Sequence, residues 1–128
     1  MKKAIITPKD AVEKAKMIIT DSYKEHFIGI YLNSKNVPTK IELISLGTLT
    51  ASLVHPREVF KPALINHAGS IIILHNHPSG DPEPSEDDLT ITRRLVEAGK
   101  ILGIDLLDHI IFTSGKKFYS FKENNLIQ

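Results

Sequence analysis

Two histidines and an aspartate are spaced in this sequence so that they could share a metal ion. His75 and His77 follow the short apolar run Ile71 to Leu74, and Asp88 comes three residues after Ser85. Because side chains alternate along a strand, the two imidazoles project to the same face. Two imidazoles and one carboxylate, with a fourth position left for water, form the ligand set of a catalytic zinc ion.

A buried strand is expected to carry the two histidines. The run Ile71 to Leu74 is unbroken and β-favouring; Gly69-Ser70 opens it, and Pro78-Ser79-Gly80 closes the segment. A continuous apolar run of this length is typical of a strand that is covered on both faces.

A helix is expected to bring Asp88 to the same place. Ser85 is a good N-cap residue, acidic residues fill the first turn, and Gly103 supplies the stop after Leu102. At about 100° per residue, one stripe of this helix faces the core. It contains Asp88, Thr92, Leu95, Gly99 and Leu102. A lone Ser-x-x-Asp pair would indicate only a capping box, but the two upstream histidines favour the metal site.

Hydrolysis is the chemistry that such a site suits, because zinc lowers the pKa of its bound water from about 15.7 toward 7. The reaction also needs a general base and a donor for the developing oxyanion. Ser85 is the candidate donor. The base is Glu25, which opens a strand ending at Asn33, or Glu42, which lies in a strand from Lys40 to Leu46 that pairs with the first as a hairpin. Glu25 is the better candidate and Glu42 the runner-up, and the local pattern does not decide between them.

The remaining pattern alternates strands and helices, which predicts an α/β sandwich with a mixed sheet. Besides the segments above, the expected elements are a helix from about Pro8 to Ile19, a short strand from Thr48 to Val54, a helix from Pro56 to about Asn66, and strands from Asp105 to Thr113 and from Lys117 to Phe121.

Composition limits the class of protein. The 128 residues fit one domain, 41% of them are apolar, and the net charge of +1 comes without a basic stripe for nucleic acid. The absence of cysteine removes disulfides and the Cys-containing zinc site of nucleobase deaminases. With no apolar run near 20 residues and no signal-peptide core, a cytoplasmic location is expected.

The other histidines are expected to be structural. His109 lies inside an apolar strand, where a hydrogen-bonded core histidine is the usual case; alternatively Asp108 or His109 orients a ligand imidazole. His55 is expected to lead into a helix, and His26 and His67 to lie at the surface.

Taken together, these motifs resemble the RadC branch of the JAB/MPN domains. The residues that carry the resemblance are Glu25-x-Phe27, His55-Pro56-Arg57-Glu58, His75 to Gly80, Pro84-Ser85 with Asp88, and Asp108 to Ile111. The resemblance implies a cytidine-deaminase-like three-layer α/β sandwich. It also implies that His75, His77 and Asp88 bind one Zn²⁺ per chain, that Glu25 is the general acid/base, and that Ser85 stabilises the tetrahedral intermediate.

In active relatives such a site cleaves peptide or isopeptide bonds, so a peptide or protein substrate is expected. The stretch before Thr7 has no room for the helix-hairpin-helix region of long members, and direct nucleic-acid binding is therefore not expected. The alternative is a metal-stabilised binding or scaffold module, with a link to DNA repair or DNA metabolism. An iron oxygenase or a phosphodiesterase fits the ligand order and number less well. Exposed edge strands are compatible with a homodimer.

Overall fold

The structure, a computed structural model, describes residues 3–127, which form three helices and a five-stranded sheet. In chain order the elements are α1 (Pro8–Lys16), β1 (His26–Leu32), β2 (Pro38–Leu46), α2 (Pro56–Ile65), β3 (Ser70–Asn76), α3 (Glu86–Leu102), β4 (Asp105–Phe112) and β5 (Phe118–Ser120).

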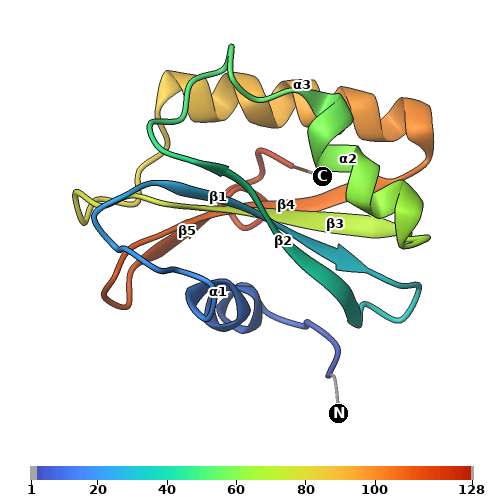
Figure 1. Ribbon diagram of the computed structural model, residues 1–128, viewed down its shortest axis with the longest axis horizontal. Coiled ribbons are helices and arrows are strands. Elements are labelled where there is room, and N and C mark those ends of the chain that lie inside the picture. Colours follow the sequence, from blue (N-terminus) through green and yellow to red (C-terminus); the bar gives the residue numbers. More distant parts are fainter. Residues whose placement is uncertain (1–2, 128) are drawn as a thin grey trace.

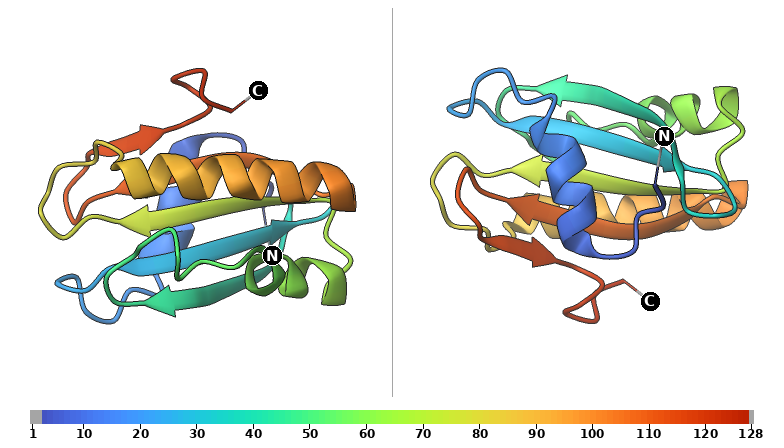
Figure 2. Two further views of the ribbon diagram at one scale, coloured as in Figure 1. Left: turned by 90° about the horizontal axis from the view of Figure 1, so that it is seen from above. Right: turned by 90° about the horizontal axis from the view of Figure 1, so that it is seen from below.

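The sheet is mixed, as expected. Its strand order is β2-β1-β3-β4-β5, in which β3 and β4 are parallel and all other neighbours are antiparallel. The helices α2 and α3 cover one face, and α1 crosses the other (Figure 1). Figure 2 shows the same layers from above and below, with α3 beside β3 and β4 and α1 alone on the opposite face. This is the predicted three-layer α/β sandwich.

Strand alternation divides the core into two apolar clusters, one on each face of the sheet. Phe27, Ile71 and Ile73 pack with residues of α2 and α3, whereas Ile28 and Leu74 pack with residues of α1. By the same alternation, the side chain of His75 lies on the face of the first cluster and that of Asn76 on the face of the second. These two neighbouring residues therefore point to opposite faces of the sheet.

The helix α3 follows its sequence signals closely. Ser85 is the N-cap of a complete capping box with Asp88, and Gly103 ends the helix in the left-handed region with φ of 72°. Asp88, Thr92, Leu95 and Gly99 are buried as predicted, while Leu102 at the end of the stripe is exposed. The hairpin of β1 and β2 is also confirmed.

Two predicted elements differ from the structure by more than two residues at one end. The first helix ends at Lys16 instead of Ile19, because residues 17–19 form a tighter turn in which Ile18 N–H donates to the carbonyl of Ala15. The prediction of a strand from Thr48 to Val54 is wrong. Gly47, with φ of 114°, ends β2, and the following residues form turns and bends from which Leu49 and Val54 reach the core.

Within residues 3–127, no helix has the length and apolar character needed to cross a membrane.

Gly99 lies where α3 packs against the chain entering β4. A Cβ at this position would lie 2.4 Å from the carbonyl oxygen of Ile104, which is backbone and cannot turn away. Gly99→Ala should lower the free energy of unfolding by about 1–3 kcal/mol, because this clash outweighs the roughly 1 kcal/mol that alanine gains over glycine in a helix. Urea unfolding measures the difference.

Gly69→Ala is the matched control. A Cβ there meets nothing within 4 Å, and the backbone is outside the left-handed region. It should leave stability unchanged or raise it by about 0.4–1 kcal/mol. Equal effects of the two substitutions would contradict the close approach of α3 and β4.

Candidate metal centre

The end of β3 places His75 and His77 on the face that α3 covers. His75 is the penultimate residue of the strand, and His77 N–H continues the pairing by donating to the carbonyl of Phe112 at 2.9 Å. The backbones of both histidines are therefore held by β4. His75 is 2% exposed and the side chain of His77 is 13% exposed.

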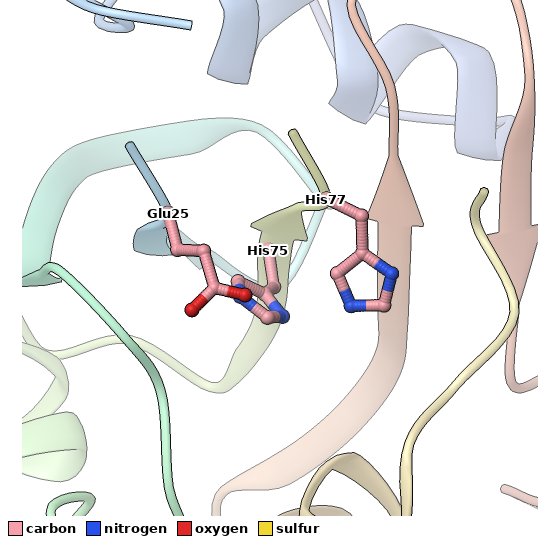
Figure 3. A group of neighbouring side chains, drawn as sticks. All are labelled: Glu25, His75 and His77. Carbon is pink, nitrogen blue, oxygen red and sulfur yellow. The ribbon is translucent and has the colours of Figure 1, made fainter. Parts of the chain in front are cut away.

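Glu25 reaches the same histidines from the position just before β1. Phe27 pairs with His75 in the antiparallel ladder, so Glu25, two residues earlier, lies on the same face, next to the start of β1. Its Oε1 is 3.5 Å from Nε2 of His75, and its side chain is 26% exposed. Figure 3 shows the carboxylate of Glu25 directed toward the ring of His75, with His77 beside it.

The first turn of α3 brings Asp88 against both imidazoles. Its Oδ1 lies 3.3 Å from Nδ1 of His75, its Oδ2 lies 3.2 Å from Nε2 of His77, and the side chain is 1% exposed. Oδ2 also accepts a 2.8 Å hydrogen bond from Ser85 N–H. The capping box and the contacts to the histidines are thus made by one carboxylate.

The donor atoms suit a bound cation. Both ring nitrogens of His75 are buried without a hydrogen-bond partner among residues 3–127. Nδ1 of His77 lies 2.9 Å from the carbonyl of Asp81, which can only accept, so Nδ1 carries the proton and the Nε2 lone pair faces Asp88. A lone pair that faces a carboxylate needs a positive charge between them, either a proton or a metal ion.

Glu25, His75 and His77 each offer a ligand atom, and these atoms lie within 4.8 Å of one another. This group could hold a metal ion. Asp88 contacts both histidines, at Nδ1 of His75 and Nε2 of His77, whereas Glu25 faces Nε2 of His75. The predicted ligand set instead combined the two histidines with Asp88 and gave Glu25 the role of base, and this division stays a prediction.

The protonation states of Asp88 and the two histidines depend on one another. Burial raises the pKa of Asp88, but the facing imidazoles of His75 and His77 and the hydrogen bond from Ser85 N–H outweigh it and hold this pKa well below its ordinary value. The hydrogen bond to Asp88 raises the pKa of His77. The carboxylate is therefore charged and favours a positive charge on the histidine side.

A cleft of about 590 Å³ opens over these side chains. Glu25, His75, His77 and Ser85 line it, together with residues of the loop that follows β2. Ser85 Oγ accepts a hydrogen bond from Asp88 N–H at 3.1 Å, which leaves its own O–H proton free to donate toward the cleft.

The loop after β2 is fastened to this site by contacts that sequence reasoning missed. Leu49 N–H donates to Oε2 of Glu25 at 2.8 Å, and Ala51 N–H donates to Asp87 at 3.1 Å. Arg94 of α3 donates to the carbonyl of Ala51 at 2.6 Å. No local pattern could reveal these contacts, because they join backbone atoms of a loop to side chains that are distant in the sequence.

The structure separates the two carboxylates that the sequence left open. Glu42 lies on the edge strand β2, opposite Gly29, in a groove against α2 and away from the histidines. Only Glu25 of this pair contacts His75.

Two further histidine predictions have clear outcomes. His26, expected at the surface, is completely buried, because it begins β1, which is buried at every position; its Nδ1 lies 2.9 Å from the carbonyl of Lys24. His109 is the expected core histidine: it stacks on Phe121 and its Nδ1 lies 2.6 Å from the hydroxyl of Thr92. Asp108 accepts hydrogen bonds from His109 N–H, Ser120 and Lys122 N–H, and none from a candidate ligand.

The sequence model of the RadC-like JAB domain matches residues 5–126. The chain belongs to the RadC-like JAB domain family. Among its relatives, a UPF0758 protein of Methanosarcina acetivorans is 48% identical over 127 residues, 99% of this chain and 55% of the relative. A UPF0758 protein of Shouchella clausii is 52% identical over 119 residues, 93% of this chain and 51% of the relative. The chain therefore spans about half the length of the curated relatives it matches.

The burial of His109 in this RadC-like JAB domain predicts a pH dependence of stability. Burial lowers the pKa of His109 from 6.5 to about 3. As the pH falls through this window, the unfolded state takes up a proton that the folded state does not, so the free energy of unfolding decreases. His109→Phe should remove this contribution and make stability less dependent on pH in the same window, as measured by urea unfolding.

Thr92→Val provides the control, because it removes the hydrogen bond but retains the imidazole. It should lower the free energy of unfolding by about 1 kcal/mol at neutral pH. The dependence of this free energy on pH should remain that of the wild type. An unchanged pH dependence of stability in His109→Phe would mean that His109 binds its proton equally well in the folded and the unfolded state.

Proposed function

We propose that this domain is a zinc-dependent hydrolase of peptide or isopeptide bonds. The observation that carries the proposal is the convergence of His75, His77 and the buried Asp88, with the two histidines lining a cleft and the carboxylate of Glu25 facing His75 from just before β1. Membership of the RadC-like JAB family supports it.

In this proposal His75, His77 and Asp88 hold one Zn²⁺. The charged carboxylate and the buried, unpaired imidazole nitrogens supply the mixed nitrogen and oxygen donors that zinc prefers. When bound, zinc would lower the pKa of a coordinated water to about 7 and polarise the substrate carbonyl.

Glu25 is the proposed general base. Leu49 N–H holds its Oε2, so Oε1 remains available to take a proton from the attacking water. The same carboxyl then returns this proton to the departing amine, which completes the transfer without a second acid. Its partial exposure into the cleft allows water to reach it.

Ser85 is the proposed donor to the oxygen that becomes negative on the substrate carbonyl. Its hydroxyl proton is not used in the capping box, since Oγ accepts there. A donor placed at the rim of a partly dry cleft stabilises developing charge more than one in bulk water. Asp81 and Glu83 are exposed on the neighbouring loop, and their charge disfavours a polyanionic substrate.

Metal content distinguishes the proposed ligand, Asp88, from the proposed base, Glu25. Asp88→Ala should lose zinc, because a ligand is removed and a buried histidine pair is left without its counter-charge. Glu25→Gln should retain about one zinc per chain, as it keeps the acceptor for Leu49 N–H. Plasma mass spectrometry of proteins purified without chelator or metal-affinity resin measures the ratio. Equal zinc loss in both variants would place Glu25 among the ligands.

Turnover tests the reaction itself. A screen of fluorogenic peptide and isopeptide substrates should find hydrolysis by the wild type, and Glu25→Gln should lower kcat by about 10²–10⁴-fold, the usual contribution of a general base. Full activity in Glu25→Gln would refute the assigned role. A zinc-loaded wild type that cleaves none of the amide substrates would favour the binding or scaffold module.

A further inference from the structure

Asn76 lies between the two histidines in sequence but points to the opposite face of β3, and the proposed reaction makes no use of it. It is 5% exposed. We infer that Asn76 is a positioning residue that fixes Glu25 relative to the histidines by clamping the backbone on both sides of it. The inference rests on the proposed role of Glu25.

The side-chain amide of Asn76 spans the residue that precedes Glu25 and the residue that follows it. Its Oδ1 accepts from His26 N–H at 2.5 Å, and its Nδ2 donates to the carbonyl of Lys24 at 2.9 Å. The backbone amide can only donate and the carbonyl can only accept, so the orientation of the Asn76 amide is determined.

The register of the sheet explains why a side chain is needed at this point. The ladder between β1 and β3 ends at the pair Phe27 and His75, and Glu25 lies just before β1. The Asn76 amide continues the pairing where backbone pairing stops. Glu25 is thereby tied to β3, the strand that leads into both histidines.

Two other contacts hold Glu25, and both come from the loop after β2. Gly47 N–H donates to its backbone carbonyl at 2.9 Å, and Leu49 N–H donates to Oε2. These contacts relate Glu25 to the loop, whereas those of Asn76 relate it to β3. Asn76 is adjacent in sequence to both histidines, so its hydrogen bonds fix the distance between the proposed base, Glu25, and the two candidate ligands.

The ring of His26 strengthens the clamp. Its Nδ1 also donates to the carbonyl of Lys24, so this carbonyl accepts from two buried side chains. The fixed Lys24 carbonyl leaves Glu25 little backbone freedom. An aspartate at position 76 would keep the acceptor for His26 N–H but set a second acceptor against the Lys24 carbonyl, and an alanine would make neither contact.

Amide hydrogen exchange of Leu49 reports the position of Glu25 without any substrate. Leu49 N–H is protected by Glu25 Oε2 and has no hydrogen bond to Asn76. Asn76→Asp and Asn76→Ala should speed exchange of this amide about tenfold, toward the rate in Glu25→Ala, because the acceptor is no longer held in place. Either variant suffices if the other folds poorly. Zinc content should stay at the wild-type level.

Ser120→Ala is the matched control, because it removes a buried hydrogen bond to Asp108 outside the Glu25 segment. It should lower global stability, read from the amide of Ile73 in β3, without a selective effect on Leu49. In the double variant Asn76→Asp/Glu25→Ala, Leu49 exchange should be no faster than in Glu25→Ala alone, since both changes act through the same carboxylate.

The inference is overturned if Leu49 exchange in the Asn76 variants changes only in proportion to global stability, or if the effects of Asn76→Asp and Glu25→Ala add in the double variant. With a cleavable substrate, Asn76→Asp should reduce kcat about tenfold or more at unchanged KM. If the wild type proves inactive, the proposed function fails, while the exchange measurement still decides whether Asn76 positions Glu25.

Discussion

The buried carboxylate of Asp88 stays charged only because two histidines and a backbone amide face it, since burial of a lone carboxylate costs several kcal/mol of hydration. Oδ1 faces His75, and Oδ2 faces both His77 and Ser85 N–H. This arrangement requires the first turn of α3 to lie over the end of β3. The long loop between them, the capping box and the packing of Gly99 against Ile104 all contribute to that placement.

The alternation of β3 assigns different tasks to adjacent residues. His75 and His77 face α3 and the cleft, whereas Asn76 faces the α1 side and binds the backbone next to Glu25. The sheet thus separates the histidines of the proposed reaction from Asn76, which is proposed to position Glu25. A substitution at Asn76 can therefore change the geometry of Glu25 without touching a candidate ligand.

Periodicity explains how much of this could be predicted from the sequence. The apolar run before His75 and the capping box of Ser85 with Asp88 are local signals, so β3, α3 and the inward direction of Asp88 follow from them. The choice of Glu25 over Glu42 depends on the register between Phe27 and His75, which no local pattern contains. The same is true of the buried His26 and of the loop that Leu49 and Ala51 attach to the site.

We propose that one zinc ion lies among His75, His77 and Asp88, with Glu25 outside its coordination shell. Anomalous diffraction at the zinc edge from zinc-loaded crystals tests it most directly. The account predicts a single peak about 2.0–2.2 Å from a ring nitrogen of each histidine and from an Asp88 oxygen, with Glu25 hydrogen-bonded to a water on the ion. A peak coordinated by Glu25 in place of Asp88, or no peak between the histidines, would contradict it.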